Sequence, residues 1–185
     1  MSWRTTIVLW LSAVIICARS AFPDFIPAVH TFTSSKLPDF ILPRQLTIVV
    51  DERVANSTKD NGLTLIPPTL LSFASTFASD IEELFPGTSA KVITGGAPSR
   101  TWSGFIYMTI SDSLNATLAD GTATTEGYML DSSPSGITIT GSGAKGAFWG
   151  TRTLLQGLVL SQRHFPSGSI IDQPDWRTRG FMLGA

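Results

Sequence analysis

Residues 136–156, with the sequence GITITGSGAKGAFWGTRTLLQ, decide the fold of this chain. The first part, residues 136–140, alternates isoleucine with threonine, as a half-buried antiparallel strand does. The last part carries apolar residues at helical spacing, so we expect a helix over residues 143–162 with Ser142 as its cap. The glycine-rich residues 141–146 lie between the two. The stretch therefore predicts a strand, a tight turn and a helix that packs back onto the strand.

Upstream of this stretch, strand patterns surround one further helix. The proline pair before Thr69 suits the first turn of a helix whose apolar face continues to Leu84. Residues 133–136 have the composition of a hairpin turn. Short strands are expected at residues 45–51, 91–94, 105–111 and 127–132. This order predicts an α+β domain, with a mostly antiparallel sheet and two helices packed on one face.

The first twenty residues are typical of a secretory signal peptide. Arg4 precedes an apolar run over residues 5–18, which is shorter than the roughly 20 residues that a membrane span needs. Ala18 and Ser20 are small residues that suit cleavage after residue 20, whereas an uncleaved membrane anchor is the alternative. We therefore expect the protein in the secretory pathway, either secreted or in a vacuolar lumen.

Two sequons agree with this route. Asn56 and Asn115 each begin an Asn-X-Ser/Thr triplet within a polar stretch that is typical of a loop. We predict that both are glycosylated.

Composition disfavours several classes of protein. The chain has 13 basic and 14 acidic residues, so no basic surface favours nucleic acid. One cysteine, Cys17, excludes a disulfide scaffold, and two histidines, His30 and His164, disfavour a metal centre. We expect neither a metal nor a cofactor.

The glycine-rich turn offers one alternative. Gly141, Gly143 and Gly146 form a GxGxxG between a strand and a helix, which is the context of a dinucleotide site, and Asp172 ends the next expected strand. The threonines of the preceding strand argue against this hypothesis, because a central parallel strand is apolar on both faces. A purely structural turn is the preferred interpretation.

Other catalytic patterns find little support. The sequence contains neither GxSxG nor HExxH. The acidic pairs Asp51-Glu52 and Glu82-Glu83 are expected to face solvent, and His164 is expected to be a solvated histidine at a helix end. No complete acid/base site is expected in this chain, and no residue is predicted to be catalytic.

Three motifs, in order, resemble glycoside hydrolase family 20. They are EGYML at residues 126–130, GITI at residues 136–139 and GAFWGTRTLLQ at residues 146–156. The family consists of exo-acting β-N-acetylhexosaminidases, whose non-catalytic N-terminal domain has similar motifs at similar spacing. The resemblance covers roughly residues 45–185 and implies that residues 21–168 form that domain.

The resemblance extends into the end of the chain. Asp172, Pro174 and the sequence RGFML at residues 179–183 are similar to the family's lead into its (β/α)8 barrel. This implies that residues 169–185 are a linker and the first strand of a catalytic barrel that continues beyond Ala185.

Catalysis in the resembling family is substrate-assisted. The 2-acetamido oxygen of the sugar attacks the anomeric carbon, an Asp orients the acetamido group, and a Glu is the general acid. That pair would lie beyond Ala185, so we expect this chain to be inactive alone. Arg179 matches the family's sugar-binding arginine, with Arg177 as a weaker candidate, whereas Gly184 stands where the family usually has Asp.

Two functions follow as hypotheses. The first is the N-terminal part of a secreted exo-β-N-acetylhexosaminidase acting on N-acetyl-hexosamine-terminated glycans or chitin oligosaccharides. The alternative is a non-catalytic secreted carbohydrate-binding or accessory module. For that module Trp102 and Trp176 are the candidate sugar platforms, while Trp149 is expected in the core.

Overall fold

The computed structural model describes residues 24–58, 66–99 and 101–178. The predictions for the signal peptide, Arg179 and Gly184 lie outside the described residues. The described elements are β1 (Thr31–Ser34), β2 (Phe40–Ile41), β3 (Gln45–Asp51), α1 (Leu70–Leu84), β4 (Ser89–Gly95), β5 (Phe105–Ile110), β6 (Tyr128–Ser133), β7 (Gly136–Gly141), α2 (Ala144–Leu160), β8 (His164–Phe165) and β9 (Gly168–Asp172).

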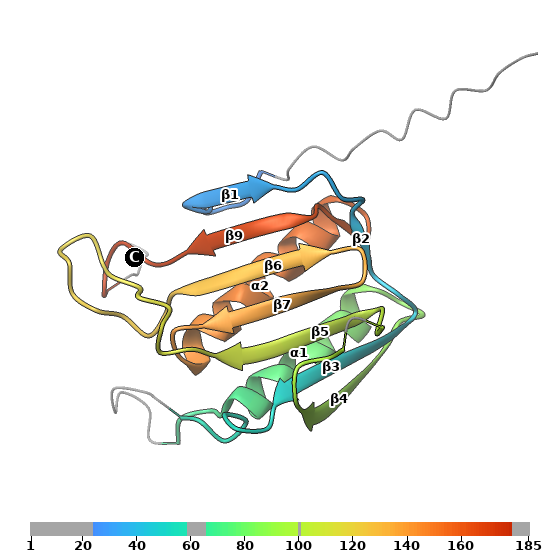
Figure 1. Ribbon diagram of the computed structural model, residues 1–185, viewed down its shortest axis with the longest axis horizontal. Coiled ribbons are helices and arrows are strands. Elements are labelled where there is room, and N and C mark those ends of the chain that lie inside the picture. Colours follow the sequence, from blue (N-terminus) through green and yellow to red (C-terminus); the bar gives the residue numbers. More distant parts are fainter. Residues whose placement is uncertain (1–23, 59–65, 100, 179–185) are drawn as a thin grey trace, which may run out of the picture.

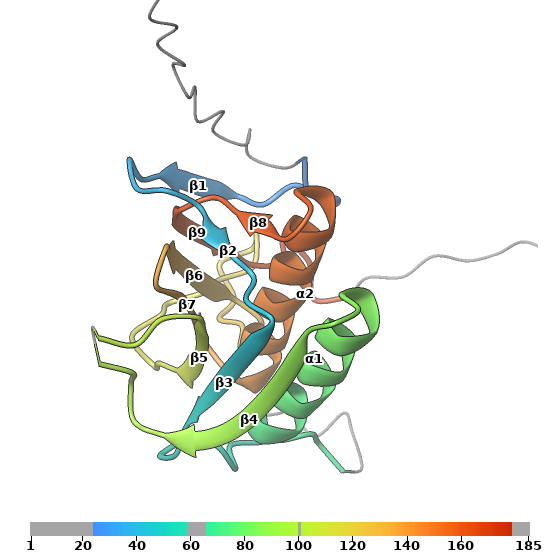
Figure 2. The same ribbon diagram turned by 90° about the vertical axis from the view of Figure 1, so that its right-hand side faces the viewer.

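One seven-stranded sheet organises these elements in the order β1-β9-β6-β7-β5-β3-β4, and β2 and β8 form a separate two-stranded ribbon (Figure 1). Both helices lie on the same side of the sheet (Figure 2). The α+β class and the position of the helices are therefore confirmed.

The expectation of a mostly antiparallel sheet is wrong. The strands β4, β3, β5 and β7 are mutually parallel, whereas β6, β9 and β1 continue the sheet in antiparallel pairs. Alternation of apolar and polar residues indicates only that one face of a strand is covered. Because the helices cover a single face, β7 keeps its Ile/Thr alternation although it runs parallel to β5. The same fact removes the argument that this alternation gave against a dinucleotide fold.

The core fills the space between the sheet and the two helices. The strands contribute apolar residues from alternate positions, and the helices contribute one face each. Fully buried side chains include Ile48, Ile106, Ile137, Ile139, Phe77, Ile81, Leu154 and Leu158. At the start of α1 the hydroxyl of Thr69 accepts a hydrogen bond from the backbone N–H of Ser72 at 3.0 Å, which caps the helix.

The turn between β7 and α2 differs in one detail from the prediction. Gly143, not Ser142, is the N-cap residue of α2, and its backbone is extended. The Ser142 hydroxyl instead bonds the loop before β6, because it accepts from the N–H of Gly127 at 3.1 Å. A Cβ at Gly146 would overlap the carbonyl oxygen of Gly127, so only glycine permits this approach of helix to loop.

Candidate functional site: an aromatic and acidic cleft

A cleft of about 640 Å³ lies where α2, the beginning of β6 and the end of β9 meet. Its walls come from segments that are far apart in the sequence. They are the residues before β1, the start of β6, the outer face of α2 and the residues that follow β9. The cleft therefore exists only in the folded domain.

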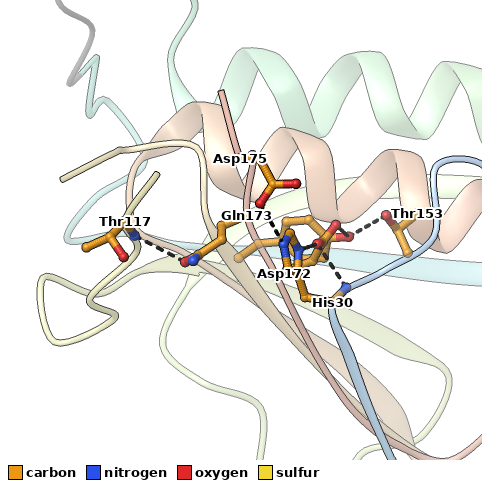
Figure 3. Close-up of polar contacts among 7 residues, drawn as sticks. His30, Thr117, Thr153, Asp172, Gln173 and Asp175 are labelled. Atoms are coloured by element: carbon orange, nitrogen blue, oxygen red, sulfur yellow. Dashed lines mark hydrogen bonds and ion pairs between the residues drawn. The ribbon is translucent and has the colours of Figure 1, made fainter. Parts of the chain in front are cut away.

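Asp172 is the centre of the polar network in this cleft. Its Oδ1 lies 2.5 Å from Nδ1 of His30 and accepts the backbone N–H of His30 at 3.2 Å. Its Oδ2 accepts the hydroxyl of Tyr128 at 3.0 Å, and that hydroxyl lies 2.6 Å from Oγ1 of Thr153. The network joins the N-terminal segment, β6, β9 and α2 (Figure 3).

His30 meets a second carboxylate on its other ring nitrogen, because Nε2 lies 3.1 Å from Oδ1 of Asp175. The hydrogen bonds to Asp172 and, secondarily, to Asp175 raise the pKa of His30 above 6.5. Burial raises the pKa of the neighbouring Tyr128, which is therefore a neutral hydrogen-bond donor at physiological pH.

Two indole rings line the cleft. Trp149 on α2 is 41% exposed and Trp176 after β9 is 67% exposed. The indole N–H of Trp149 donates to Oε2 of Glu126 at 3.2 Å, which orients the ring beside an acidic group. Aromatic faces beside carboxylate and amide acceptors suit ligands that combine C–H surfaces with hydroxyl groups.

The expectation that Trp149 lies in the core is therefore wrong. The buried side of α2 runs through Ala147, Thr151, Leu154 and Leu158. Each helical residue advances the face by about 100°, so Trp149 points about 200° away from Ala147. Trp102, which is 45% exposed in the loop between β4 and β5, does not line the cleft.

The other predicted site residues do not line the cleft. Asn56 follows β3 and Asn115 lies between β5 and β6, and both side chains are exposed. Arg177 is exposed close to the cleft-lining Trp176. His164 is exposed but begins β8, after α2 has ended, so its expected position at a helix end is wrong.

The expectation that both residues of the pair Asp51-Glu52 face solvent is wrong for Asp51. Asp51 is only 1% exposed and accepts hydrogen bonds from Nη2 of Arg53 and from the hydroxyl of Thr109, each at 2.7 Å. The Arg53 guanidinium holds the pKa of Asp51 well below its usual range. Asp51 is thus a structural anion rather than a solvated one, whereas Glu82 and Glu83 are exposed as expected.

Two backbone N–H groups of the glycine-rich turn already donate hydrogen bonds within the protein. The N–H of Ser142 donates to the carbonyl of Gly127 at 2.8 Å, and the N–H of Gly146 donates to the carbonyl of Thr125 at 3.1 Å. A dinucleotide site needs such N–H groups free to meet a pyrophosphate. The glycines therefore serve close packing, in agreement with the structural interpretation.

Across residues 24–58, 66–99 and 101–178, no cluster of three or more His, Cys, Asp or Glu side chains is arranged to hold a metal ion. Within the same ranges, neither helix has the length and apolar character that crossing a bilayer requires.

Several solved structures that share this fold are β-N-acetylhexosaminidases. The fold is similar to that of a mutant beta-hexosaminidase from Streptomyces plicatus, with a TM-score of 0.57 and 21% sequence identity. The likeness covers 82% of this chain and 26% of that chain. At this identity the likeness concerns the fold alone, and it defines the class as an α+β domain with a mixed sheet and two helices.

The family model described as glycosyl hydrolase family 20, domain 2, matches residues 23–173. The chain therefore belongs to glycosyl hydrolase family 20, as the sequence motifs indicated.

Two curated relatives agree with this assignment. The lacto-N-biosidase of Bifidobacterium bifidum is 30% identical over 116 residues, which are 63% of this chain. The beta-hexosaminidase of Porphyromonas gingivalis is 45% identical over 67 residues, which are 31% of this chain. The matched parts span only 10% and 9% of those proteins.

Proposed function

We propose that this chain is the N-terminal supporting domain of a secreted exo-β-N-acetylhexosaminidase. The observation that carries the proposal is the family match over residues 23–173. The substrate would be a glycan or chitin oligosaccharide that ends in N-acetyl-hexosamine. Hydrolysis would be substrate-assisted and would take place in a catalytic barrel encoded after residue 185.

The first test concerns the reaction itself. The purified 185-residue chain is expected to give no turnover of an aryl N-acetyl-β-glucosaminide. The coding sequence downstream of the Ala185 codon is expected to continue in frame into a barrel with an adjacent Asp-Glu pair, and the extended protein is expected to release the aryl group. Turnover by the 185-residue chain would contradict the proposal that this domain only supports a catalytic barrel.

Arg179 is the residue of this chain that we propose to contact the sugar in the catalytic barrel. A guanidinium offers several fixed donors to hydroxyl groups and keeps its charge. In the extended protein, Arg179→Lys is expected to raise KM for the aryl glycoside more than Arg177→Lys, which alters the weaker candidate for the same role. Equal kinetics in the two variants would reject this role.

Secretion and glycosylation belong to the same proposal. Exposure of Asn56 and Asn115 in loops supports modification of both. When the chain is expressed in a eukaryotic secretory system, Asn56→Gln and Asn115→Gln are each expected to remove one glycan. The measurement is the gel mobility of each variant and of the parent before and after treatment with an N-glycanase. A variant that migrates like the parent before this treatment would contradict the prediction.

The cleft favours a second candidate function, saccharide binding by the domain itself. Trp149 and Trp176 line one cleft together with the acceptors Glu126, Gln156 and Gln173. A stacked sugar would place its C–H face on an indole and its hydroxyls toward these acceptors.

A chitin pull-down tests this candidate. The isolated chain is expected to be retained, and Trp149→Ala and Trp176→Ala are each expected to lower retention several-fold. Trp102→Ala is the matched control, because that ring is similarly exposed but lies outside the cleft. Loss of retention in all three variants, or no retention of the parent chain, would reject a site in the cleft.

A further inference from the structure

The N-terminal edge of the sheet is a short strand, and the segment before it is anchored by the buried Phe25 and by two hydrogen bonds between the backbone of Ile26 and the side chain of Gln156. The four-residue strand β1 pairs only with β9, and three of its four residues are exposed. His30 directly precedes β1, and the segment that leaves the sheet begins after Asp172 at the end of β9. The side chain of His30 joins these two segments across the cleft (Figure 3).

We propose that His30 is a pH-operated clasp: its protonated ring ties the start of the N-terminal edge strand to both Asp172 and Asp175, and on deprotonation it loses one of these two ring contacts. The proposal concerns the domain itself and does not depend on the proposed hexosaminidase function.

The geometry requires the charged form of the ring. Nδ1 faces a carboxylate oxygen of Asp172 and Nε2 faces one of Asp175, at 2.5 and 3.1 Å. A neutral imidazole carries one N–H and one lone pair, so one of its nitrogens would face an anionic oxygen without a proton between them. Only the imidazolium donates to both carboxylates at once. The paired contacts of His30 with Asp172 and Asp175 therefore require the imidazolium form of the ring.

Asp172 is held in place independently of the ring. Its carboxylate also accepts the backbone N–H of His30 and the hydroxyl of Tyr128. Asp175 is fixed through its backbone, because its carbonyl oxygen accepts the N–H of Ala119 at 2.9 Å. Asp172 thus stays in position when the ring loses its proton, and so does the backbone that carries Asp175.

The other charged groups of the cleft favour the imidazolium. Glu126 lines the same cleft and adds negative charge. Arg152 on α2 also lines it, but its guanidinium forms an ion pair with Asp80 of α1 at 2.6 Å. The side chain of His30 is 42% exposed, so protons reach the ring without unfolding of the domain.

The direction of the pH effect follows from linkage. Since the pKa of His30 is raised in the folded state, the clasp stabilises the domain fully below about pH 6.5. That stabilisation is lost as the pH rises through the pKa of the folded protein. The edge strand is therefore expected to be tightest in acid and loosest in alkaline solution.

The direct test is an NMR titration of the full chain labelled in its imidazole rings. Only two histidines are present, so the His164→Gln variant assigns both signals. The expected result is a midpoint for His30 above 6.5. Asp175→Asn, which removes an exposed partner, is expected to lower that midpoint while leaving the fold intact. A midpoint at or below 6.5, or one that Asp175→Asn does not lower, would overturn the proposal.

The functional test is amide hydrogen exchange at pH 5.5 and pH 8.5, with rates corrected for intrinsic exchange. Protection of the β1–β9 amides is expected to fall several-fold at the higher pH, while the β3–β5 amides serve as the internal reference. In His30→Gln the β1–β9 protection is expected to be equally low at both values, whereas His164→Gln is expected to behave like the parent. A pH dependence that persists in His30→Gln would overturn the clasp.

Discussion

Asp51 shows at the scale of a residue how a charge can be buried at the end of a strand. Its carboxylate is satisfied by Arg53 and Thr109, and the guanidinium of Arg53 reaches it from two residues away with Nε at 3.0 Å. A buried carboxylate with such partners contributes to stability, and its removal leaves the partly buried hydroxyl of Thr109 without its acceptor, whereas the exposed guanidinium of Arg53 turns to water.

We predict that Asp51→Ala lowers the free energy of unfolding at pH 7 by about 2–3 kcal/mol, the size typical of hydrogen bonds to a buried charged group. Because the folded pKa of Asp51 lies below the ordinary value of 3.8, its stabilising effect is complete above that value and declines as the pH falls further. Urea unfolding at pH 7 and pH 3 measures both effects. Glu52→Ala, at the exposed neighbour, is the control and should change stability by less than about 0.5 kcal/mol. An equal loss in the two variants would contradict the prediction.

The contact of α2 with the sheet is decided at the scale of the element. The helix begins so close to the loop before β6 that the backbone N–H of Gly146 donates to the carbonyl of Thr125. The motif GAFWG therefore reflects helix packing, because a Cβ at Gly146 would overlap the carbonyl group of Gly127.

We predict that Gly146→Ala destabilises the domain by more than about 2 kcal/mol, although alanine is the better helix former, because the helix must move away from its loop. Thermal unfolding measures the effect. Gly96→Ala is the matched control, since a Cβ there meets nothing within 4 Å. A Gly146→Ala variant as stable as the parent would show that the helix can shift without cost.

On the scale of the whole molecule, one apolar core joins the parallel and antiparallel halves of the sheet. The same cluster contains Ile48 of β3 and Leu130 of β6, with Phe77 and Leu158 from the two helices. A continuous core of this size favours a single cooperative unfolding transition.

We predict that Phe77→Ala lowers stability by about 3–5 kcal/mol and shifts all transitions together. Phe77 lies on α1, beside the parallel strands, whereas Trp149 and Trp176 report on the cleft at the antiparallel half. When the other three tryptophans are replaced by phenylalanine, tryptophan fluorescence reports on the cleft, and far-ultraviolet circular dichroism reports on all helices and strands. Separate midpoints for the two signals would show that the halves unfold independently.

Local patterns predicted most elements correctly. The strand at residues 45–51 and the hairpin turn at residues 133–136 were placed as the structure has them, because β-branched runs and turn residues act over short distances. The short strands β1, β2 and β8 were missed, since two to four residues carry no readable periodicity.

The cleft could not be predicted in the same way. His30 and Asp172 are 142 residues apart, and neither lies in a motif that points to the other. Trp149 offered one usable signal, because its position on the helical wheel opposes the apolar face. Its meeting with Trp176 depends on the path of the chain after β9.

Both helices, the longer strands, the burial of one strand face and membership of glycosyl hydrolase family 20 follow from the amino-acid sequence, since these depend on local side-chain patterns and on motif spacing. The tertiary structure alone decided the mixed direction of the sheet and the assembly of the cleft. Strand partners are chosen by contacts between distant segments, and a pattern that states only which face is buried does not specify the neighbour.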